Sequence, residues 1–141
     1  MVVLDTDLLS LLERSTSVET TRLRERLAAL AQEDIATTII SFEEQMRGWL
    51  SYLARAKALP QQVEAYKRLK KHLVNYRRRL VLGFDERAAE EFERLQHLRL
   101  RIGTMDLKIA AIVLAHQVTL LSRNLQHFRQ VPGLDVEDWT V

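Results

Sequence analysis

The chain has 141 residues, of which 47% are hydrophobic and 28% charged, a composition typical of a globular protein. Without cysteine it has neither a disulfide framework nor a thiolate metal site, and no apolar run approaches the ~20 residues of a membrane span. The start of the chain lacks the features of a signal peptide, so we expect a cytoplasmic protein with no membrane partner. The net charge is only +2 but the pI is about 9.1, so the distribution of charge matters more than its sum.

The first seven residues combine an apolar run with two acids. Met1 to Leu4 has the continuous apolar pattern of a strand that is buried on both faces, as in a parallel sheet covered by helices. Asp5 follows at once, and a helical pattern of leucines begins at Leu8. Open α/β sheets place their ligands at the carboxyl ends of the strands, which is where Asp5 would stand.

The rest of the chain alternates between strand and helix patterns. Strands are predicted at 35–40, 80–82, 118–121 and 134–136, and helices at 18–33, from Ser41 to beyond 53, at 61–76, from 86 to about 100, from Thr104 to 114, and in a short link to Phe128. Pro60 is expected in the first turn of its helix, and Asp85 is expected to cap the next one. This pattern predicts one α/β domain over residues 1–141, with a central, mainly parallel sheet of about five strands flanked by helices. Right-handed crossovers would bring the carboxyl ends of the strands to one edge.

Acidic residues follow several of these strands or turns: Asp5 with Asp7, the pair Glu43 and Glu44, and Asp106. Each has a purely structural explanation. Ser41 to Glu44 has the spacing of a capping box, and Thr104 could cap the helix in whose first turn Asp106 would lie. Asp7 could likewise interact with a helix dipole.

Convergence of these acids at one sheet edge is harder to explain by capping alone. Two like charges ~4 Å apart repel by roughly 4 kcal/mol at an effective dielectric near 20. A hard divalent ion with oxygen ligands, Mg²⁺ or Mn²⁺, would turn that repulsion into attraction. The four histidines have no metal-ligand spacing, and only His127 falls near the expected edge.

The segment from Arg55 to Arg79 carries nine cations and a single acid, Glu64. Such a run is either a solvated helix face, a surface for an acidic protein, or a surface that holds the backbone of a nucleic acid. In the last case the contacts would come from a subset of this run: Lys67, Lys70, Lys71, Arg77, Arg78 and Arg79.

Four stretches resemble the sequence motifs of PIN-domain proteins, and of VapC-type toxins in particular. Leu4-Asp5-Thr6-Asp7 is similar to the first motif of that family, and Ser41 to Trp49 resembles the second, with an acid four residues before Gly48. That spacing selects Glu44 over Glu43. Ile102 to Ala111 resembles the third motif and contains Asp106, and residues 119–139 resemble the carboxyl-terminal signature.

This resemblance implies a Mg²⁺-dependent endoribonuclease, with Mn²⁺ as a plausible substitute. It would be the toxin of a toxin–antitoxin pair, dimeric, and inhibited by a VapB-type antitoxin that covers the acidic pocket. Asp5, Glu44 and Asp106 would be the catalytic and metal-binding residues, and supporting roles would fall to Thr6, Ser122, Asn124 and His127.

The chain also departs from the family pattern. Many relatives have a fourth acid at the position of Asn124 or of His127, and this chain has neither. One alternative is therefore a PIN scaffold that binds RNA or a protein without cutting. Another is a metal-dependent phosphatase acting on small molecules, which would have no use for the basic stretch.

Overall fold

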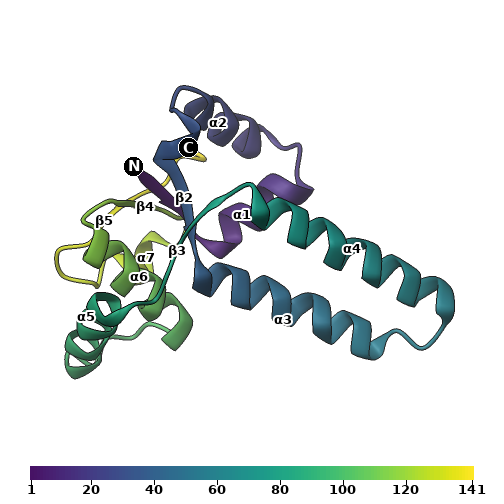
Figure 1. The fold of residues 1–141 in the computed structure, drawn as a ribbon. Coiled ribbons are helices and arrows are strands. Elements are labelled where there is room, and N and C mark those ends of the chain that lie inside the picture. The colour runs from purple at the N-terminus through teal and green to yellow at the C-terminus, as the bar shows by residue number, and fades with distance from the viewer.

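The computed structural model describes all residues, 1–141, and contains one five-stranded sheet in the order β3-β2-β1-β4-β5 (Figure 1). Every neighbouring pair of strands is parallel, so the prediction of a mainly parallel sheet is confirmed. The strands are β1 (Val2–Leu4), β2 (Ile35–Thr38), β3 (Leu80–Leu82), β4 (Thr119–Leu121) and β5 (Asp135–Glu137).

Helices cover both faces of this sheet. They are α1 (Thr6–Arg14), α2 (Val18–Ala28), α3 (Ile39–Arg55), α4 (Leu59–Arg77), α5 (Glu86–His97), α6 (Thr104–His116) and α7 (Leu125–Phe128), with one 3₁₀ turn, η1 (Gln32–Asp34). Two predicted helices end early. α2 stops at Ala28, where the Leu30 N–H bonds the Leu27 carbonyl and closes the last turn. α5 stops at His97, because Arg99 has a positive φ of 53°.

The side chains of the central strand alternate between two cores. Val3 packs into the core formed with α5 and α6, whereas Val2 and Leu4 pack into the core formed with α1 and α2. In β4, Leu120 belongs to the first core and Leu121 to the second. The sheet is therefore the middle layer of three, which explains why its strands read as continuous apolar runs.

The junction between β2 and α3 differs from the sequence prediction. The strand ends at Thr38 rather than at Ile40, and Thr38 Oγ1, not the Ser41 side chain, caps the helix by accepting a hydrogen bond from the Ser41 N–H at 3.2 Å. The predicted capping box is therefore wrong. Glu44 lies one turn farther into α3 than that box requires, so helix capping does not account for it.

The start of α6 also differs. Gly103 is the N-cap and no side chain caps the helix, so Thr104 is a helical residue rather than the cap. By contrast, Asp85 caps α5 as predicted, because its carboxylate accepts a hydrogen bond from the Ala88 N–H at 3.0 Å. Asp106 keeps its predicted place in the first turn of α6.

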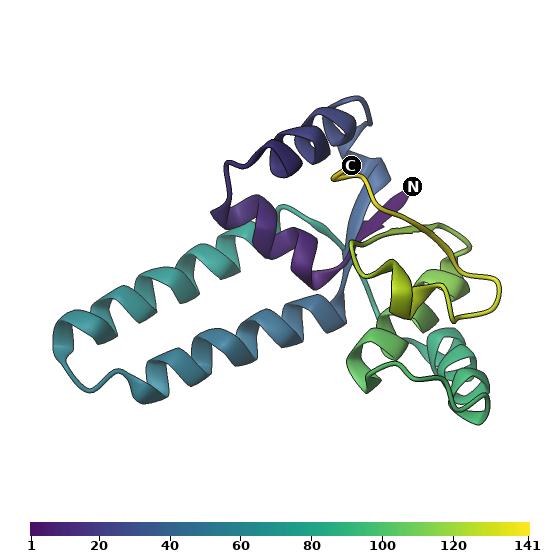
Figure 2. The same ribbon diagram turned by 180° about the vertical axis from the view of Figure 1, so that it is seen from behind.

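Helices α3 and α4 form an antiparallel pair, here called the arm, which projects away from the sheet in both opposite views (Figures 1 and 2). The arm is fixed at its base by aromatic contacts. His72 stacks on Phe42 with ring centroids 5.2 Å apart and lies 4.7 Å from the ring of Tyr76. The Tyr76 hydroxyl donates to Gln45 Oε1 at 2.7 Å. None of the helices combines the length and apolarity needed to span a membrane.

Candidate active site

Strand register brings the first and fourth strands together at the edge where the acids were expected. Leu4 pairs with Leu121, so the next residues, Asp5 and Ser122, lie side by side. Asp5 borders an open cleft of about 610 Å³ that has no hydrophobic residue in its lining. The cleft is lined by Asp5, Thr6, Asp7, Ser10, Arg14, Glu44, Asp106, Arg123 and Asn124.

Asp5 is held more firmly than the other acids of the cleft. It is only 5% exposed, and it is the N-cap of α1, where Oδ1 accepts a hydrogen bond from the Leu8 N–H at 2.9 Å. Its second oxygen, Oδ2, accepts a hydrogen bond from the Ser122 hydroxyl at 2.5 Å. Two elements far apart in the chain therefore fix the orientation of this carboxylate.

The environment of Asp5 works against its negative charge. Burial is the main reason that its pKa is raised to about 6 from an ordinary value of 3.8. The hydrogen bonds from Ser122 and Leu8 oppose this effect, and the carboxylates of Asp7 and Asp106 add to it. Burial also raises the pKa of Asp106. In both residues burial, rather than repulsion from neighbouring carboxylates, is the main cause of the raised pKa.

Glu44 and Glu43 lie in different surroundings although they are consecutive. Glu44 lines the cleft, and its Oε1 accepts a hydrogen bond from the Thr6 hydroxyl at 2.6 Å. Thr6 Oγ1 also lies 2.9 Å from Ser41 Oγ, which ties α1 to the first turn of α3. Glu43 instead forms an ion pair with Arg47 along the surface of α3.

Asp106, Asn124 and His127 are site residues that come from the last third of the chain. Asp106 is half-buried, and the charge of His127 lowers its pKa, in opposition to burial. Asn124 Nδ2 lies 2.9 Å from His127 Nδ1, and the Asn124 N–H donates to Ser122 Oγ at 2.9 Å. Asn124 thus lines the cleft directly, whereas the exposed His127 contacts it through Asn124.

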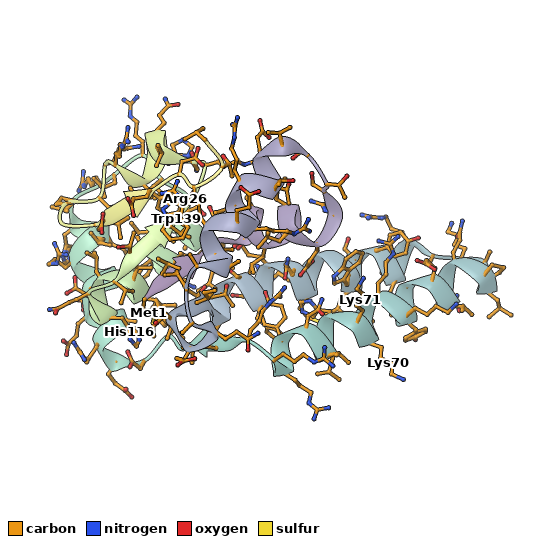
Figure 3. The ribbon with its side chains drawn as sticks, turned by 90° about the horizontal axis from the view of Figure 1, so that it is seen from above. Met1, Arg26, Lys70, Lys71, His116 and Trp139 are labelled. Atoms are coloured by element: carbon orange, nitrogen blue, oxygen red, sulfur yellow. The ribbon has the colours of Figure 1, made fainter.

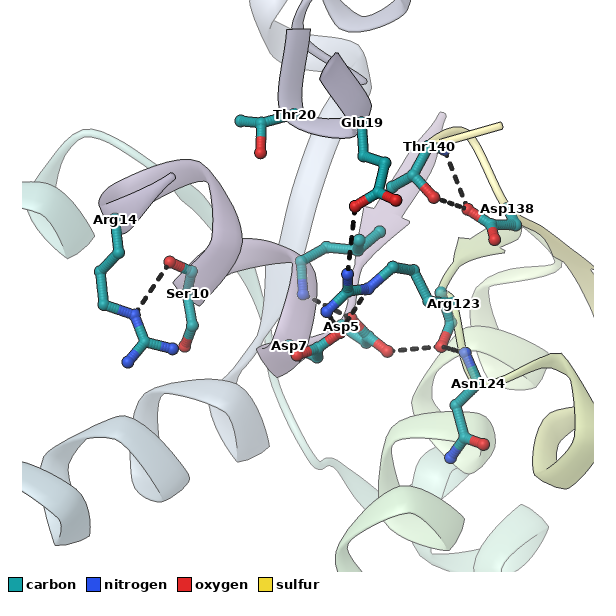
Figure 4. Close-up of polar contacts among 12 residues, drawn as sticks. Asp5, Asp7, Ser10, Arg14, Glu19, Thr20, Arg123, Asn124, Asp138 and Thr140 are labelled. Atoms are coloured by element: carbon teal, nitrogen blue, oxygen red, sulfur yellow. Dashed lines mark hydrogen bonds and ion pairs between the residues drawn. The ribbon is translucent and has the colours of Figure 1, made fainter. Parts of the chain in front are cut away.

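Arg123 is part of the cleft that the sequence prediction did not include. Its guanidinium pairs with Asp7 at 2.8 Å and lies 3.9 Å from Glu19, above the Asp5 carboxylate (Figure 4). The hydrogen bond that Arg123 Nε donates to Asp7 is the main reason that the pKa of Arg123 is raised. Its position directly after β4, at the carboxyl end of a strand, could have identified it as a site residue from the sequence. Ser10 and Arg14 were also missed, although they recur at four-residue spacing from Thr6 on one face of α1.

The chemistry of the cleft suits a hard divalent ion, although the carboxylates do not form a compact cage. Every acid in the lining offers oxygen donors, and no cysteine or histidine competes. No three acidic or histidine side chains are grouped closely enough to hold a metal ion directly. Mg²⁺ commonly keeps several waters and uses only one or two carboxylates, so this wider spacing still fits it.

The basic residues of α4 are divided by the structure. Lys67 and Lys71 line a groove beside α1, but Lys70 and Arg77 are exposed and do not line it. Figure 3 shows Lys70 and Lys71 leaving the helix in different directions. Arg79 is engaged inside the protein, where it pairs with Glu13 at 3.1 Å.

Together, the parallel sheet and the polar, carboxylate-rich cleft at its strand ends define an α/β protein with a candidate ligand site at that edge. The PIN domain model matches residues 2–134, and the chain belongs to the PIN domain family. No curated protein matches the chain.

Several solved structures share its fold at low sequence identity. VapBC2 from Rickettsia felis, bound to a DNA fragment from their promoter, matches with 22% identity over 99% of each chain and a TM-score of 0.72. VapBC-1 from nontypeable Haemophilus influenzae has 22% identity over 100% of each chain and a TM-score of 0.72. FitAcB from Neisseria gonorrhoeae has 23% identity over 99% of this chain and 98% of that chain, with a TM-score of 0.73.

Proposed function

We propose that this PIN-domain protein is a Mg²⁺-dependent endoribonuclease and the toxin of a VapBC-type toxin–antitoxin pair. The observation that carries the proposal is the gathering of Asp5, Glu44 and Asp106 around one cleft, from three elements that are separate in sequence. Burial of Asp5 supports it, because burial raises the pKa of this carboxyl to about 6, and a bound cation would stabilise the ionised form.

In this proposal Asp5, Glu44 and Asp106 hold the ion, directly or through water. When bound, Mg²⁺ supplies Lewis-acid stabilisation of phosphate charge and favours ionisation of water. Asp5 is pre-oriented by Leu8 and Ser122, and Glu44 by Thr6, so little reorganisation is needed. Glu44 or Asp106 accepts a proton from the attacking water.

The remaining polar groups act around these acids. The Ser122 hydroxyl holds Asp5, and it accepts the Asn124 N–H, so the Asn124 side chain is presented to the cleft. Asn124 contacts the phosphate or the attacking water, and His127 supports Asn124 through their 2.9 Å contact. Cations beside the cleft hold the RNA backbone without reading its sequence.

The proposed partners follow from the family and from the solved neighbours, several of which are VapBC complexes. A VapB-type antitoxin would inhibit the protein by covering the acidic cleft, and the toxin itself would act as a homodimer. An RNA substrate and an antitoxin would both be met in the cytoplasm, so we propose that the protein acts there.

A second candidate function is a PIN scaffold that grips RNA or a protein without cutting. Two observations favour it: neither Asn124 nor His127 is an acid, and no three ligand side chains are closely grouped. The two functions differ in metal binding. A nuclease should gain thermal stability from Mg²⁺ or Mn²⁺, and chelator should stop its RNA cleavage, whereas a scaffold should show neither effect.

Glu44 and Glu43 offer a matched pair for the main test. Both are glutamates of α3, but only Glu44 faces the cleft. We expect Glu44→Gln to lose RNA cleavage by at least about 100-fold, the typical loss for one proton-transfer group. Glu43→Gln should cleave like the parent protein. Equal activity in both variants, measured on a labelled RNA with Mg²⁺, would refute the proposed site.

A further inference from the structure

The acidic cleft continues into a groove between α1 and the arm. A cavity of about 320 Å³ shares Thr6, Ser10 and Glu44 with the cleft, and a third cavity of about 300 Å³ extends it along α4. Arg14 lines all three spaces, so they form one continuous path. We call the two outer cavities the arm groove; among its lining residues are Arg14, Trp49, Tyr52, Arg55, Lys67 and Lys71.

The arm groove carries positive charge that the protein itself does not neutralise. Of its three acids, Glu13 is paired with Arg79 and Glu64 with Arg68, and Glu44 lies at the end that the groove shares with the acidic cleft. The lining cations Arg14, Arg55, Lys67 and Lys71 have no acidic partner. A path that begins among carboxylates therefore ends among free cations. This distribution of charge suits a polyanion that has one phosphate at a metal ion in the acidic cleft and its adjacent phosphates beside the cations of the arm.

Aromatic side chains line the same path. Trp49 borders both outer cavities and is only half-buried, and Tyr52 borders the middle one. The Arg68 guanidinium lies over the Trp49 ring, 5.3 Å from the ring centre, so Trp49 already stacks with a planar cation on one face. Indole rings and guanidinium planes are the surfaces on which unpaired nucleic-acid bases stack.

Gly48 is a second, independent sign of an occupant. It lies within the 17-residue helix α3, where glycine costs stability, and it lines the middle cavity beside Trp49. A Cβ built at this position meets nothing within 4 Å, so packing within the protein does not require glycine. Close approach of another molecule to the helix backbone does provide a reason for it.

We propose that the arm groove holds a single strand of RNA that leads from the acidic cleft along α1 toward α4. Arg14, Lys67 and Lys71 contact its phosphates, a base stacks on Trp49, and the strand passes closely over Gly48. This inference rests on the proposed function, since it names the substrate strand of that nuclease.

Binding can be tested without cleavage in the full-length Asp5→Asn protein without metal. The probe is a 5′-fluorescein single-stranded oligouridine of about 12 nucleotides, within the range of known single-strand sites. Lys67→Ala/Lys71→Ala is compared with Lys70→Ala/Arg77→Ala, which removes the same charge from positions outside the groove. We expect the first pair to lower the slope of log Kd against log salt by about 1.4, at about 0.7 per lost phosphate contact. The control pair should leave the slope unchanged.

Gly48→Ala separates binding from folding. It should raise the midpoint of thermal unfolding by about 3 °C, because alanine favours the helix, while it weakens RNA binding severalfold. Trp49→Leu should weaken binding about tenfold, and Trp49→Phe should restore most of the affinity by restoring a stacking surface. In a Trp139→Phe background, the single-stranded probe should quench Trp49 fluorescence, and an RNA duplex should not.

Equal salt slopes for the two lysine pairs, or undiminished affinity in Gly48→Ala, would overturn the proposal. Loss of antitoxin binding with unchanged RNA affinity would also overturn it, because the groove would then belong to a protein partner. These failures are distinct from failure of the proposed nuclease. If the parent protein cleaves RNA and the groove variants bind RNA as tightly as it does, the nuclease proposal stands and the arm-groove proposal fails. If the groove variants weaken RNA binding but the parent protein does not cleave, the arm-groove proposal stands and the nuclease proposal fails.

Discussion

Ser122 Oγ donates a hydrogen bond to Asp5 Oδ2 at 2.5 Å, joining residues 117 positions apart. The pairing of β1 with β4 makes this contact possible, because Leu4 lies opposite Leu121 and each strand ends one residue before the contact. Ser122 is fully buried and also accepts the Asn124 N–H. The Ser122 hydroxyl therefore links the Asp5 carboxylate to the segment that follows β4.

Ser122→Ala should impair the site while keeping the fold. Loss of the hydroxyl removes a hydrogen bond that lowers the pKa of Asp5, so that pKa should rise above its present value of about 6. We expect Mg²⁺ affinity to fall by about 10- to 100-fold, as for other lost partners of metal ligands. The pH profile of cleavage should move toward higher pH, which rate measurements between pH 5 and 9 would detect.

Ser10→Ala is the matched control for that variant. Ser10 also borders the cleft, but its hydroxyl contacts Gln45 and no carboxylate. Its pH profile should coincide with that of the parent protein. If both alanine variants shift the profile equally, the hydrogen bond to Asp5 is not the cause.

The raised pKa of Asp5 makes a prediction about stability. A carboxyl whose pKa is about 6 when folded and 3.8 otherwise binds its proton more tightly in the folded state. The metal-free fold therefore loses stability as pH rises from about 4 to about 6, and the penalty stays constant above that range. The difference between the two pKa values corresponds to about 3 kcal/mol.

Asp5→Asn removes that penalty, and asparagine remains a good N-cap for α1. Without metal, the variant should be about 1–3 kcal/mol more stable than the parent at pH 8 and should have no such advantage at pH 4. Urea denaturation at the two pH values measures this difference. The same gain at both pH values would show that the charge of Asp5 is not responsible.

Much of this arrangement was predictable because it depends on local patterns. The strand before Asp5 is uniformly apolar, and a parallel sheet brings strand ends to a common edge. The start of α3 was mispredicted, because Ile39 and Ile40 continue a β-branched run that looks like strand. The helix begins at Ile39 because Thr38 caps it. The strand propensity of Ile39 and Ile40 gives no sign of this cap, which is evident only in the folded structure.

Side-chain partners across the fold were not predictable in the same way. A count of cations along α4 does not show which of them face α1, and Arg79 finds its partner Glu13 66 positions away. The hydrogen bond from Thr6 to Glu44 and the ion pair of Arg123 with Asp7 likewise depend on how separate elements pack. Sequence patterns indicated the edge of the sheet, but not the polar contacts that organise it.

Thr6 and Glu44 should behave as a coupled pair. Thr6→Val keeps the shape of the side chain but removes the hydroxyl that donates to Glu44 Oε1 at 2.6 Å. Released from this bond, Glu44 should adopt several rotamers, and cleavage should slow by about tenfold, equivalent to about 1.4 kcal/mol. In a double-mutant cycle with Glu44→Gln, the Thr6→Val substitution should add almost no further loss.

Additive losses in that cycle would show that Thr6 acts separately from Glu44. Thr6→Ser provides a further check, because it restores the hydroxyl without the methyl group. It should recover most of the cleavage rate that Thr6→Val loses.

Arg79 should prove to be a structural cation, although it belongs to the basic run. It pairs with Glu13 at 3.1 Å, both side chains are less than a quarter exposed, and its guanidinium lies 4.9 Å from the Tyr76 ring centre. Arg79→Ala would leave Glu13 without its partner, and we expect a loss of about 1–3 kcal/mol in unfolding free energy. RNA affinity of the folded variant, measured below its unfolding midpoint, should stay within about twofold of the parent, since one weak distant charge contributes little.

Arg78→Ala is the control one residue earlier. Arg78 is exposed and forms no ion pair, so its removal should change stability by less than about 0.5 kcal/mol. Chemical denaturation and RNA binding on the two variants would settle the assignment. If Arg79→Ala weakened RNA binding strongly without destabilising the fold, Arg79 would be an RNA contact after all.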